Sequence, residues 1–334
     1  MNIAIYGAGS LGTIMGGYLS TTNHTVDLID NFQEHVDLLN ESGATITGTT
    51  DFNISVNALK PEEINKTYDL ILLLTKQTYN KDVLPLVKNI LSKDGILLSL
   101  QNGVPEEIVQ QYIPREHIIA GSVEFGATFK GPGVSKLTTD FDTFKNYALQ
   151  IGELNGEITD RLKELKEVLD NIGNVHLSDN LIGTKWSKLL INSAFSGLSA
   201  ALNCTYGDIL DNEFAFTVAM HVVDECIKAG HANNVQFANM GHHSMEIFKN
   251  LNYSDKLNEL MQPSRKLEAS MLQDLRKNRK TEVNNINGLV VTVGNKYNIP
   301  TPFNKKIVDI VLNASKTGKL PNFEDNLLKF KEIL

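Results

Sequence analysis

The sequence of 334 residues contains few cysteines and no long apolar run. Cys204 and Cys226 are the only cysteines, and their spacing offers neither a CxxC motif nor another metal-ligand pattern. Two cysteines in a chain of this length are typical of a reducing compartment, where we expect them to be small buried apolar residues. No run reaches the ~18–20 apolar residues of a membrane span, and Met1 leads directly into a strand-like segment. We therefore expect a cytoplasmic protein with no membrane partner.

Acidic residues outnumber basic residues in this chain. The 31 Lys and Arg residues face 39 Asp and Glu residues, which gives a net charge of −8. An acidic chain gives no electrostatic reason to expect nucleic acid or an anionic membrane as a partner, although a local basic pocket for a small anion remains compatible with this balance. Hydrophobic residues make up 42% of the chain, which is ordinary for a globular protein, and the length suggests two domains.

Short apolar runs alternate with helical patterns in the first half of the chain. The predicted strands are 3–6, 25–29, 70–74 and 96–100. Fully apolar strands separated by helices indicate a parallel sheet covered on both faces, so we predict a Rossmann-type α/β domain over residues 1–178. Glycines interrupt the pattern around 121–152, where we expect a β-rich segment that includes 148–151, followed by a helix over about 159–171.

Strand signals largely vanish after about residue 179. The predicted helices are 180–202, 211–230, 242–251, 264–280, 282–297 and 303–316. Segment 298–302 predicts a loop, because each of its prolines disfavours helix in the residue before it. The fold class we predict is therefore α/β, with an all-helical second domain at 179–334.

A glycine-rich segment follows the first predicted strand and opens the first helix. Its residues are Gly7, Ala8, Gly9, Ser10, Leu11 and Gly12. The pattern G-x-G-x-x-G is weak alone, but a strand before it and a helix after it are what dinucleotide binding requires. Gly7 permits the tight turn, Gly9 lets the backbone approach the pyrophosphate, and Gly12 permits close helix–sheet packing. The helix N-terminus offers free N–H groups to the phosphates. The alternative is a glycine-rich turn without a ligand.

Three polar residues stand at the ends of predicted strands. Asp30 could accept hydrogen bonds from both adenosine ribose hydroxyls and would repel the 2′-phosphate of NADP, so it favours NADH over NADPH. Lys76 could neutralise a phosphate or a substrate carboxylate, and Asn102 could bind the nicotinamide ribose or the substrate. The alternatives are a turn or helix cap for Asp30, an exposed loop lysine for Lys76 and a turn former for Asn102.

The helical half carries two polar sets. Lys188, Asn192 and Ser196 are spaced i, i+4, i+8 and should share one face of an otherwise apolar helix. A lysine on such a helix face needs a charge or hydrogen-bond partner or a functional role, unless its side chain extends to solvent at the rim of the domain. Ser270 and Glu282 are 12 residues apart, so they can share a face only if the helix breaks between them. His242-His243 has no metal-ligand spacing, and we predict no metal site.

Together these motifs resemble the ketopantoate reductase family from Gly7 to about Pro302. Besides the glycine segment, the resemblance is carried by Lys76, Gln101-Asn102-Gly103, Gly126-Ala127-Thr128, Trp186-Ser187-Lys188, Ser270-Met271-Leu272-Gln273-Asp274, Thr281-Glu282 and Asn287-Gly288. It implies an oxidoreductase that uses NADPH, the family norm, to reduce a small 2-keto acid. It also implies a homodimer with separate dinucleotide-binding and helical substrate domains.

The resemblance also implies roles for individual residues. Lys188 matches the family's proton donor, which hydrogen-bonds the C2 carbonyl oxygen as hydride arrives from C4 of the nicotinamide. Asn192 and Ser270 match substrate-binding positions. The positions that line the cofactor or its nicotinamide end are Lys76, Asn102, Ala127 and Glu282.

Two residues depart from the family pattern. Ser196 is a substrate-pocket position where the family usually has asparagine, often followed by proline, and here Gly197 follows. Asp30 stands where NADPH-dependent relatives tend to have a basic or neutral residue. Ketopantoate remains our first substrate. The alternatives are an NAD-dependent D-2-hydroxyacid dehydrogenase for acids branched at C3, and a redox-sensing regulator without turnover, against which Lys188 argues.

Overall fold

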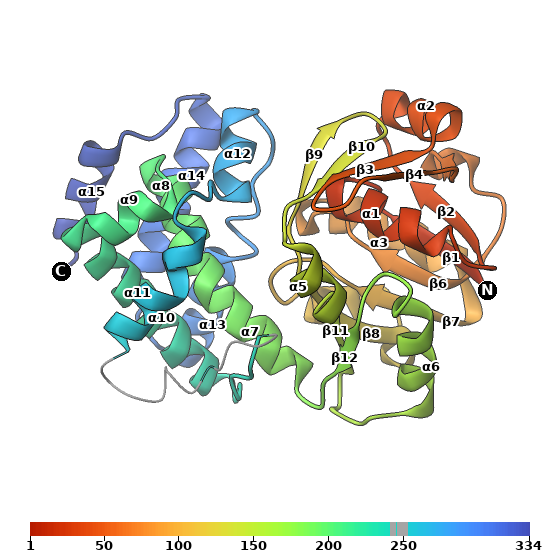
Figure 1. Cartoon of the computed structure of the whole chain (residues 1–334). Coiled ribbons are helices and arrows are strands. Elements are labelled where there is room, and N and C mark those ends of the chain that lie inside the picture. The colour runs from red at the N-terminus through yellow and green to blue at the C-terminus, as the bar shows by residue number, and fades with distance from the viewer. Residues whose placement is uncertain (241–244, 246–252) are drawn as a thin grey trace. The chain divides into compact units, whose positions relative to one another are not determined.

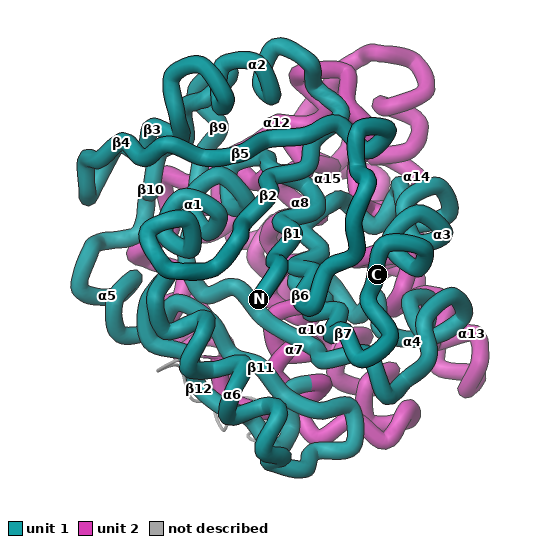
Figure 2. Tube along the Cα trace, turned by 90° about the vertical axis from the view of Figure 1, so that its right-hand side faces the viewer, with its two compact units in different colours: residues 1–181 teal, residues 182–334 magenta. Residues whose placement is uncertain are grey.

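The computed structural model describes residues 1–240, 245 and 253–334. The chain forms two compact units, residues 1–181 and 182–334 (Figures 1 and 2). This division lies close to the boundary predicted near residue 178. That the first unit binds the dinucleotide and the second the substrate stays a prediction.

An eight-stranded sheet forms the centre of the first unit, in the order β12-β11-β8-β7-β6-β1-β2-β5. Its strands are β1 (Asn2–Tyr6), β2 (Thr25–Ile29), β5 (Asn57–Leu59), β6 (Tyr68–Leu73), β7 (Leu91–Ser99), β8 (Ile118–Val123), β11 (Leu149–Glu153) and β12 (Val175–Leu177). All neighbours are parallel except β8 and β11. The Rossmann-type parallel sheet is therefore confirmed.

Helices cover this sheet on both faces (Figure 1). They are α1 (Ser10–Leu19), α2 (Gln33–Ser42), α3 (Asn80–Ile90), α4 (Glu106–Val109), α5 (Phe141–Asn146) and α6 (Asp160–Leu169). Successive side chains of β1 point to opposite faces, as the two-residue period of a strand requires. Ile3 and Ile5 pack into one core with α1 and α6, whereas Ala4 and Tyr6 pack into the other with α3 and α4.

A second, four-stranded sheet lies over α1 in the order β4-β3-β10-β9. Its strands are β3 (Ala44–Gly48), β4 (Phe52–Ile54), β9 (Ala127–Gly131) and β10 (Val134–Leu137). The β-rich character of 121–152 is confirmed, but the sequence did not predict that β10 would pair with β3. A core that includes Ile14, Ile46 and Leu137 joins α1 to this sheet.

The described part of the second unit is helical and contains no strand. Its elements are α7 (Leu181–Ile191), the π-helical turn η4 (Asn192–Gly197), α8 (Leu198–Leu202), α9 (Tyr206–Asp211), α10 (Glu213–Ala232), α11 (Ser254–Met261), the short 3-10 turn η6 (Gln262–Ser264), α12 (Ser270–Arg276), α13 (Asn287–Tyr297), α14 (Pro302–Thr317) and α15 (Phe323–Lys331). Among the described residues, no helix combines the length and the apolar character that crossing a membrane would need.

The predicted helices 180–202, 211–230 and 303–316 are confirmed within a few residues at their ends. The helix predicted over 264–280 is wrong in extent, because α12 begins only at Ser270 and ends at Arg276. The helix predicted over 282–297 begins only at residue 287. Asn278, with φ of +50°, turns the chain between the two helices. The predicted helix 242–251 and the pair His242-His243 lie outside the described residues.

Both cysteines are buried and free, as the sequence predicted. Burial raises the pKa of each thiol to about 12, so both stay protonated at neutral pH. The acidic neighbours Asp208 and Glu225 add to this effect at Cys204 and Cys226 respectively. The thiols therefore serve as apolar core groups and not as nucleophiles.

Candidate active site

Four of the predicted cofactor positions lie at one edge of the large sheet. The strands β7, β6, β1 and β2 are neighbours in that order and run parallel. Their carboxyl ends are followed by Asn102, Lys76, Gly7 and Asp30 respectively. The strand order reverses between β1 and β6, and ligands of open α/β sheets bind at the carboxyl edge beside such a reversal.

The glycine segment forms a tight turn between β1 and α1. Gly7 has φ of +104°, and its N–H donates to the Ile29 carbonyl at 2.9 Å. A Cβ added to Gly7 would lie 2.7 Å from the Thr75 nitrogen, and one added to Gly12 would overlap the Gly7 carbonyl oxygen. These two glycines are required by the protein's own packing.

Gly9 behaves differently from the other two glycines. A Cβ added there would meet no protein atom within 4 Å, and φ of −62° is accessible to other residues. The fold itself therefore does not require glycine at this position, whereas a pyrophosphate approaching the backbone would. No side chain caps the N-terminus of α1, and its first turn holds no acidic residue, so its leading N–H groups suit an anion. The segment fits a dinucleotide.

Asp30 is half-buried and performs the turn-capping role considered for it, whereas its contact with a ribose stays a prediction. One carboxylate oxygen accepts from the N–H of Phe32 at 3.0 Å, which is the turn cap. Its other oxygen forms no hydrogen bond with the described residues. The cap therefore orients the carboxylate and leaves one oxygen available to a ribose hydroxyl.

Lys76 is half-buried and precedes the short 3-10 turn η2 (Gln77–Tyr79). Asn102 is exposed and followed by Gly103 with φ of +74°, so the turn role is fulfilled there. The loops that carry these two residues are joined by a buried amide network that the sequence analysis missed. The Gln101 side chain donates to the Thr75 carbonyl at 2.8 Å and pairs with the Asn80 amide at 2.7 and 3.1 Å.

Three of the predicted residues of the second unit, Lys188, Asn192 and Ser196, lie on α7 and η4. Lys188 and Asn192 are half-buried, whereas Ser196 is only 4% exposed. In a regular α-helix, Ser196 would be rotated by about 80° from Lys188 around the helix axis, because eight residues exceed two full turns. The wider π turn at 192–197 changes this angle. The Ser196 side chain hydrogen-bonds Tyr206, whose pKa burial raises to about 12 despite that bond. Ser196, the third residue of the predicted polar face, is therefore enclosed by the helical core.

A chain of buried side chains holds η4 in place. The Asn287 amide donates to the Ser193 carbonyl at 3.0 Å and to the Asn304 side chain at 2.9 Å. The Asn304 amide donates in turn to Glu225 at 2.8 Å, and this carboxylate also accepts the N–H groups of Phe303 and Asn304. Burial raises the pKa of Glu225, while these hydrogen bonds oppose the shift. Sequence reasoning noted Asn287 only as part of a motif.

Ser270 begins α12, and Glu282 lies in the break between α12 and α13, so one continuous helix does not hold the two residues on different faces. Ser270 is the exposed first residue of α12. Glu282 is half-buried in a turn, and its backbone carbonyl accepts from the N–H groups of Asn285 and Ile286. Ala127 is the half-buried first residue of β9 in the first unit.

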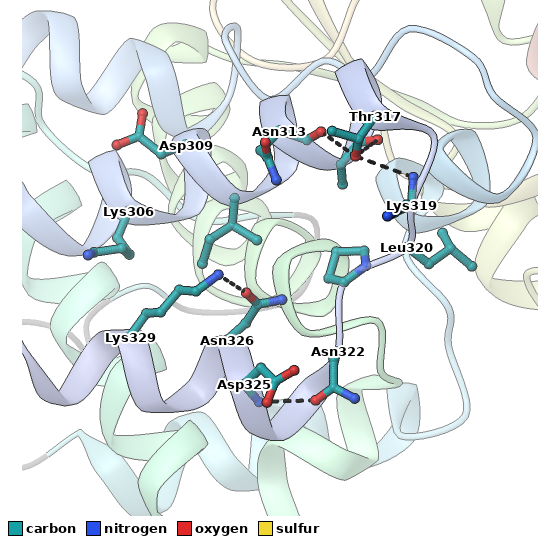
Figure 3. A pocket seen from close by; sticks show the side chains of 13 residues that line it. Lys306, Asp309, Asn313, Thr317, Lys319, Leu320, Asn322, Asp325, Asn326 and Lys329 are labelled. Atoms are coloured by element: carbon teal, nitrogen blue, oxygen red, sulfur yellow. Dashed lines mark hydrogen bonds between the residues drawn. The ribbon is translucent and has the colours of Figure 1, made fainter.

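A cavity of about 500 Å³ between α14 and α15 contains none of the predicted site residues (Figure 3). Lys306, Asn326 and Lys329 are among the side chains that line it, and Lys329 donates to the Asn326 side chain within it. The described residues contain no cluster of His, Cys, Asp and Glu suited to a metal ion.

Comparison with known proteins identifies relatives across both units. The family described as "Ketopantoate reductase PanE/ApbA" matches residues 3–154, and its C-terminal part matches residues 180–314. A 2-dehydropantoate 2-reductase from Pyrococcus horikoshii is 31% identical over 306 residues, which is 91% of this chain and 94% of that protein. One from Streptococcus pyogenes is 29% identical over 317 residues, which is 93% of this chain and 97% of that protein.

Solved structures share the whole fold. D-mandelate dehydrogenase in its ternary complex with NADH and anilino(oxo)acetate superposes with a TM-score of 0.84 at 25% identity, covering 96% of this chain and 100% of the other. A PanE/ApbA family ketopantoate reductase from Ralstonia eutropha gives a TM-score of 0.82 at 25% identity, with the same coverage. The combination of a parallel-sheet unit and a helical unit is therefore confirmed as the fold of these proteins.

The contrast between Gly9 and Gly12 gives a matched test of the dinucleotide site. We expect Gly9→Ala to change the free energy of unfolding by less than about 1 kcal/mol, because the methyl group meets no protein atom. The same variant should bind NADH much more weakly in a fluorescence titration. Gly12→Ala should lower stability in a urea titration, because its methyl overlaps the Gly7 carbonyl. Unchanged NADH affinity in Gly9→Ala would contradict the assignment.

Proposed function

Since this chain belongs to the ketopantoate reductase family, we propose that it reduces a 2-keto acid to the 2-hydroxy acid with a nicotinamide dinucleotide. The proposed substrate is ketopantoate (2-dehydropantoate), whose reduction to pantoate serves pantothenate biosynthesis. The observation that carries this proposal is the family match in both units, because it includes the glycine segment and Lys188 together. A homodimer in the cytoplasm is part of the same proposal.

The first unit binds the dinucleotide. The N–H groups at the start of α1 would hold the pyrophosphate beside Gly9, where a side chain would meet no protein atom within 4 Å. Asp30 accepts hydrogen bonds from the adenosine ribose. Lys76, Asn102 and Ala127 line the cofactor toward its nicotinamide end.

The second unit supplies the proton. The bound nicotinamide supplies a hydride to the C2 carbonyl carbon of the keto acid. The Lys188 ammonium donates a hydrogen bond to the carbonyl oxygen, stabilises the alkoxide as it forms and transfers its proton to it. Asn192 and Ser270 hold the substrate, and Glu282 lines the nicotinamide end. Ser196 is 4% exposed, so it would meet the substrate only where the pocket opens beside it.

One observation favours a second candidate, an NAD-dependent D-2-hydroxyacid dehydrogenase for acids branched at C3. Ketopantoate carries a hydroxyl group that a polar pocket residue would bind. The Ser196 hydroxyl is already paired with Tyr206, so replacing the family's asparagine by serine removes a polar group from the pocket. Asp30 supports the same candidate through its preference for NADH.

The two candidates are separated by initial rates with ketopantoate, 2-ketoisovalerate and benzoylformate at matched concentrations. We expect the highest kcat/KM with ketopantoate. A clear preference for either of the other acids with NADH would refute ketopantoate as the substrate and support the dehydrogenase. Absence of turnover with all three, together with tight dinucleotide binding, would contradict a reductase and support a regulator.

Lys188→Ala should lower kcat with the preferred keto acid by ~10²–10⁴-fold, the usual contribution of a positioned general acid. The dissociation constant of NADH should not change, because Lys188 contacts the keto acid and not the dinucleotide in this proposal. The control is Lys163→Ala, which removes an exposed lysine of α6 and should leave kcat unchanged. If Lys188→Ala keeps most of its kcat, the proposed mechanism is wrong.

Asp30 should make NADH the better cofactor, with a higher kcat/KM than NADPH, because its carboxylate repels the 2′-phosphate. Asp30→Asn is the matched variant, since the amide oxygen can still accept from the Phe32 N–H and preserve the turn. This variant should bring the two kcat/KM values closer together, mainly by improving KM for NADPH. Equal or better efficiency of the wild type with NADPH would contradict the prediction.

A further inference from the structure

Two carbonyl groups of the glycine segment are fixed by side chains from outside it. The Ala8 carbonyl oxygen accepts from the Thr13 hydroxyl at 2.7 Å and contacts Nε2 of His35 at 2.7 Å. The Ser10 carbonyl oxygen accepts from the Ser135 hydroxyl, also at 2.7 Å. Thr13, His35 and Ser135 are all at most 1% exposed, so both carbonyl groups point into the protein interior.

The protonation of His35 follows from its partners. The Gly133 N–H lies 2.9 Å from Nδ1 and can only donate, so Nδ1 must be the unprotonated acceptor. Nε2 therefore carries the hydrogen and donates to the Ala8 carbonyl. A single neutral imidazole thus links the glycine segment to the main chain of Gly133.

Gly133 and Ser135 both belong to the β9–β10 hairpin of the second sheet. Gly133 lies in the turn between the strands, and Ser135 lies on β10, next to β3. The ring of Phe129 on β9 packs edge-on against His35, with ring centres 5.1 Å apart. The hairpin therefore contacts the glycine segment through hydrogen bonds at two points and supports the imidazole by packing.

We propose that His35 and Ser135 are positioning residues for the dinucleotide, and we call them the loop clamp. A carbonyl oxygen turned toward the pyrophosphate would repel it, whereas the clamp holds the Ala8 and Ser10 carbonyls inside. The N–H groups at the start of α1 then face the phosphates without reorganisation on binding, whereas those of Gly7 and Ala8 donate to the Ile29 carbonyl. The clamp rests on the proposed function, because it requires that residues 7–12 bind a dinucleotide.

The clamp also joins two parts of the cofactor site. The hairpin that holds the glycine segment begins at Ala127, which the family resemblance places at the nicotinamide end. Hydrogen bonds are directional, so the two contacts fix the hairpin relative to the start of α1. Loss of the clamp should therefore weaken binding of the whole dinucleotide rather than of the adenosine half alone.

The test is a fluorescence titration of the full chain with NADH, without keto acid, at a temperature where circular dichroism shows each variant folded. His35→Ala should raise the dissociation constant about tenfold or more, because it leaves the buried Gly133 N–H without its acceptor and the Ala8 carbonyl with Thr13 as its remaining donor. Ser135→Ala should raise it less, since it removes one neutral hydrogen bond. His24→Ala, which changes a histidine of the same unit outside the clamp, should bind NADH like the wild type.

Two conservative variants separate a positioning role from general stabilisation. His35→Gln can keep a donor near the Ala8 carbonyl, whereas His35→Asn can keep an acceptor near the Gly133 N–H. If the Ala8 contact positions the loop, His35→Gln should retain more NADH affinity than His35→Asn, whatever their melting temperatures. The KM for the keto acid at saturating NADH should stay at the wild-type value in both.

Three outcomes would overturn the clamp. The first is wild-type NADH affinity in folded His35→Ala and Ser135→Ala. The second is higher affinity in His35→Asn than in His35→Gln. The third is failure of the wild type to bind NADH or NADPH, which would remove the proposed function as well, whereas the first two would leave that function intact.

Discussion

Parallel pairing of β1 with β2 on one side and with β6 on the other is the constraint on which the first unit depends. It places the glycine segment at the centre of the carboxyl edge and puts Asp30 and Lys76 on opposite sides of it. The same pairing buries both faces of β1, so its residues 3–6 must all be apolar. The sheet core and the site geometry therefore follow from one set of hydrogen bonds.

The second sheet fixes the orientation of the carbonyl groups in the glycine segment, which the pairing of β1 does not determine. A glycine-rich turn is conformationally free and would expose carbonyl and N–H groups alike. Packing of β3 and β10 over α1 brings Gly133 and Ser135 to the turn, and these groups bind its carbonyls directly or through His35. The fold thus uses the Ala8 and Ser10 carbonyls and the N–H groups of Gly7 and Ala8, and no side chain caps the N–H groups at the start of α1, where an anion would bind.

Much of the fold was predictable because its signals are local. The apolar strand runs, the fingerprint and the long amphipathic helices each lie within one short window of sequence. The pairing of β10 with β3 joins segments about 90 residues apart, and no local pattern encodes it. The π turn was equally hidden, because it depends on the Asn287 amide binding the Ser193 carbonyl from another helix. The sequence placed the break between α12 and α13 only at residue 281, and its length was missed because lysine-rich and arginine-rich segments have high helix propensity.

The polar residues of the helical unit differ in burial. One buried group consists of Asn287, Asn304 and Glu225. These side chains form hydrogen bonds with one another, with η4 and with the start of α14. Sequence spacing alone cannot distinguish such residues from ligand-binding ones, since both are polar positions on apolar helices. Burial makes the distinction, because a residue at 0–6% exposure cannot meet a substrate without a pocket opening beside it. Lys188 and Asn192 are half-buried on the same helical segment, and this partial exposure is compatible with the roles proposed for them.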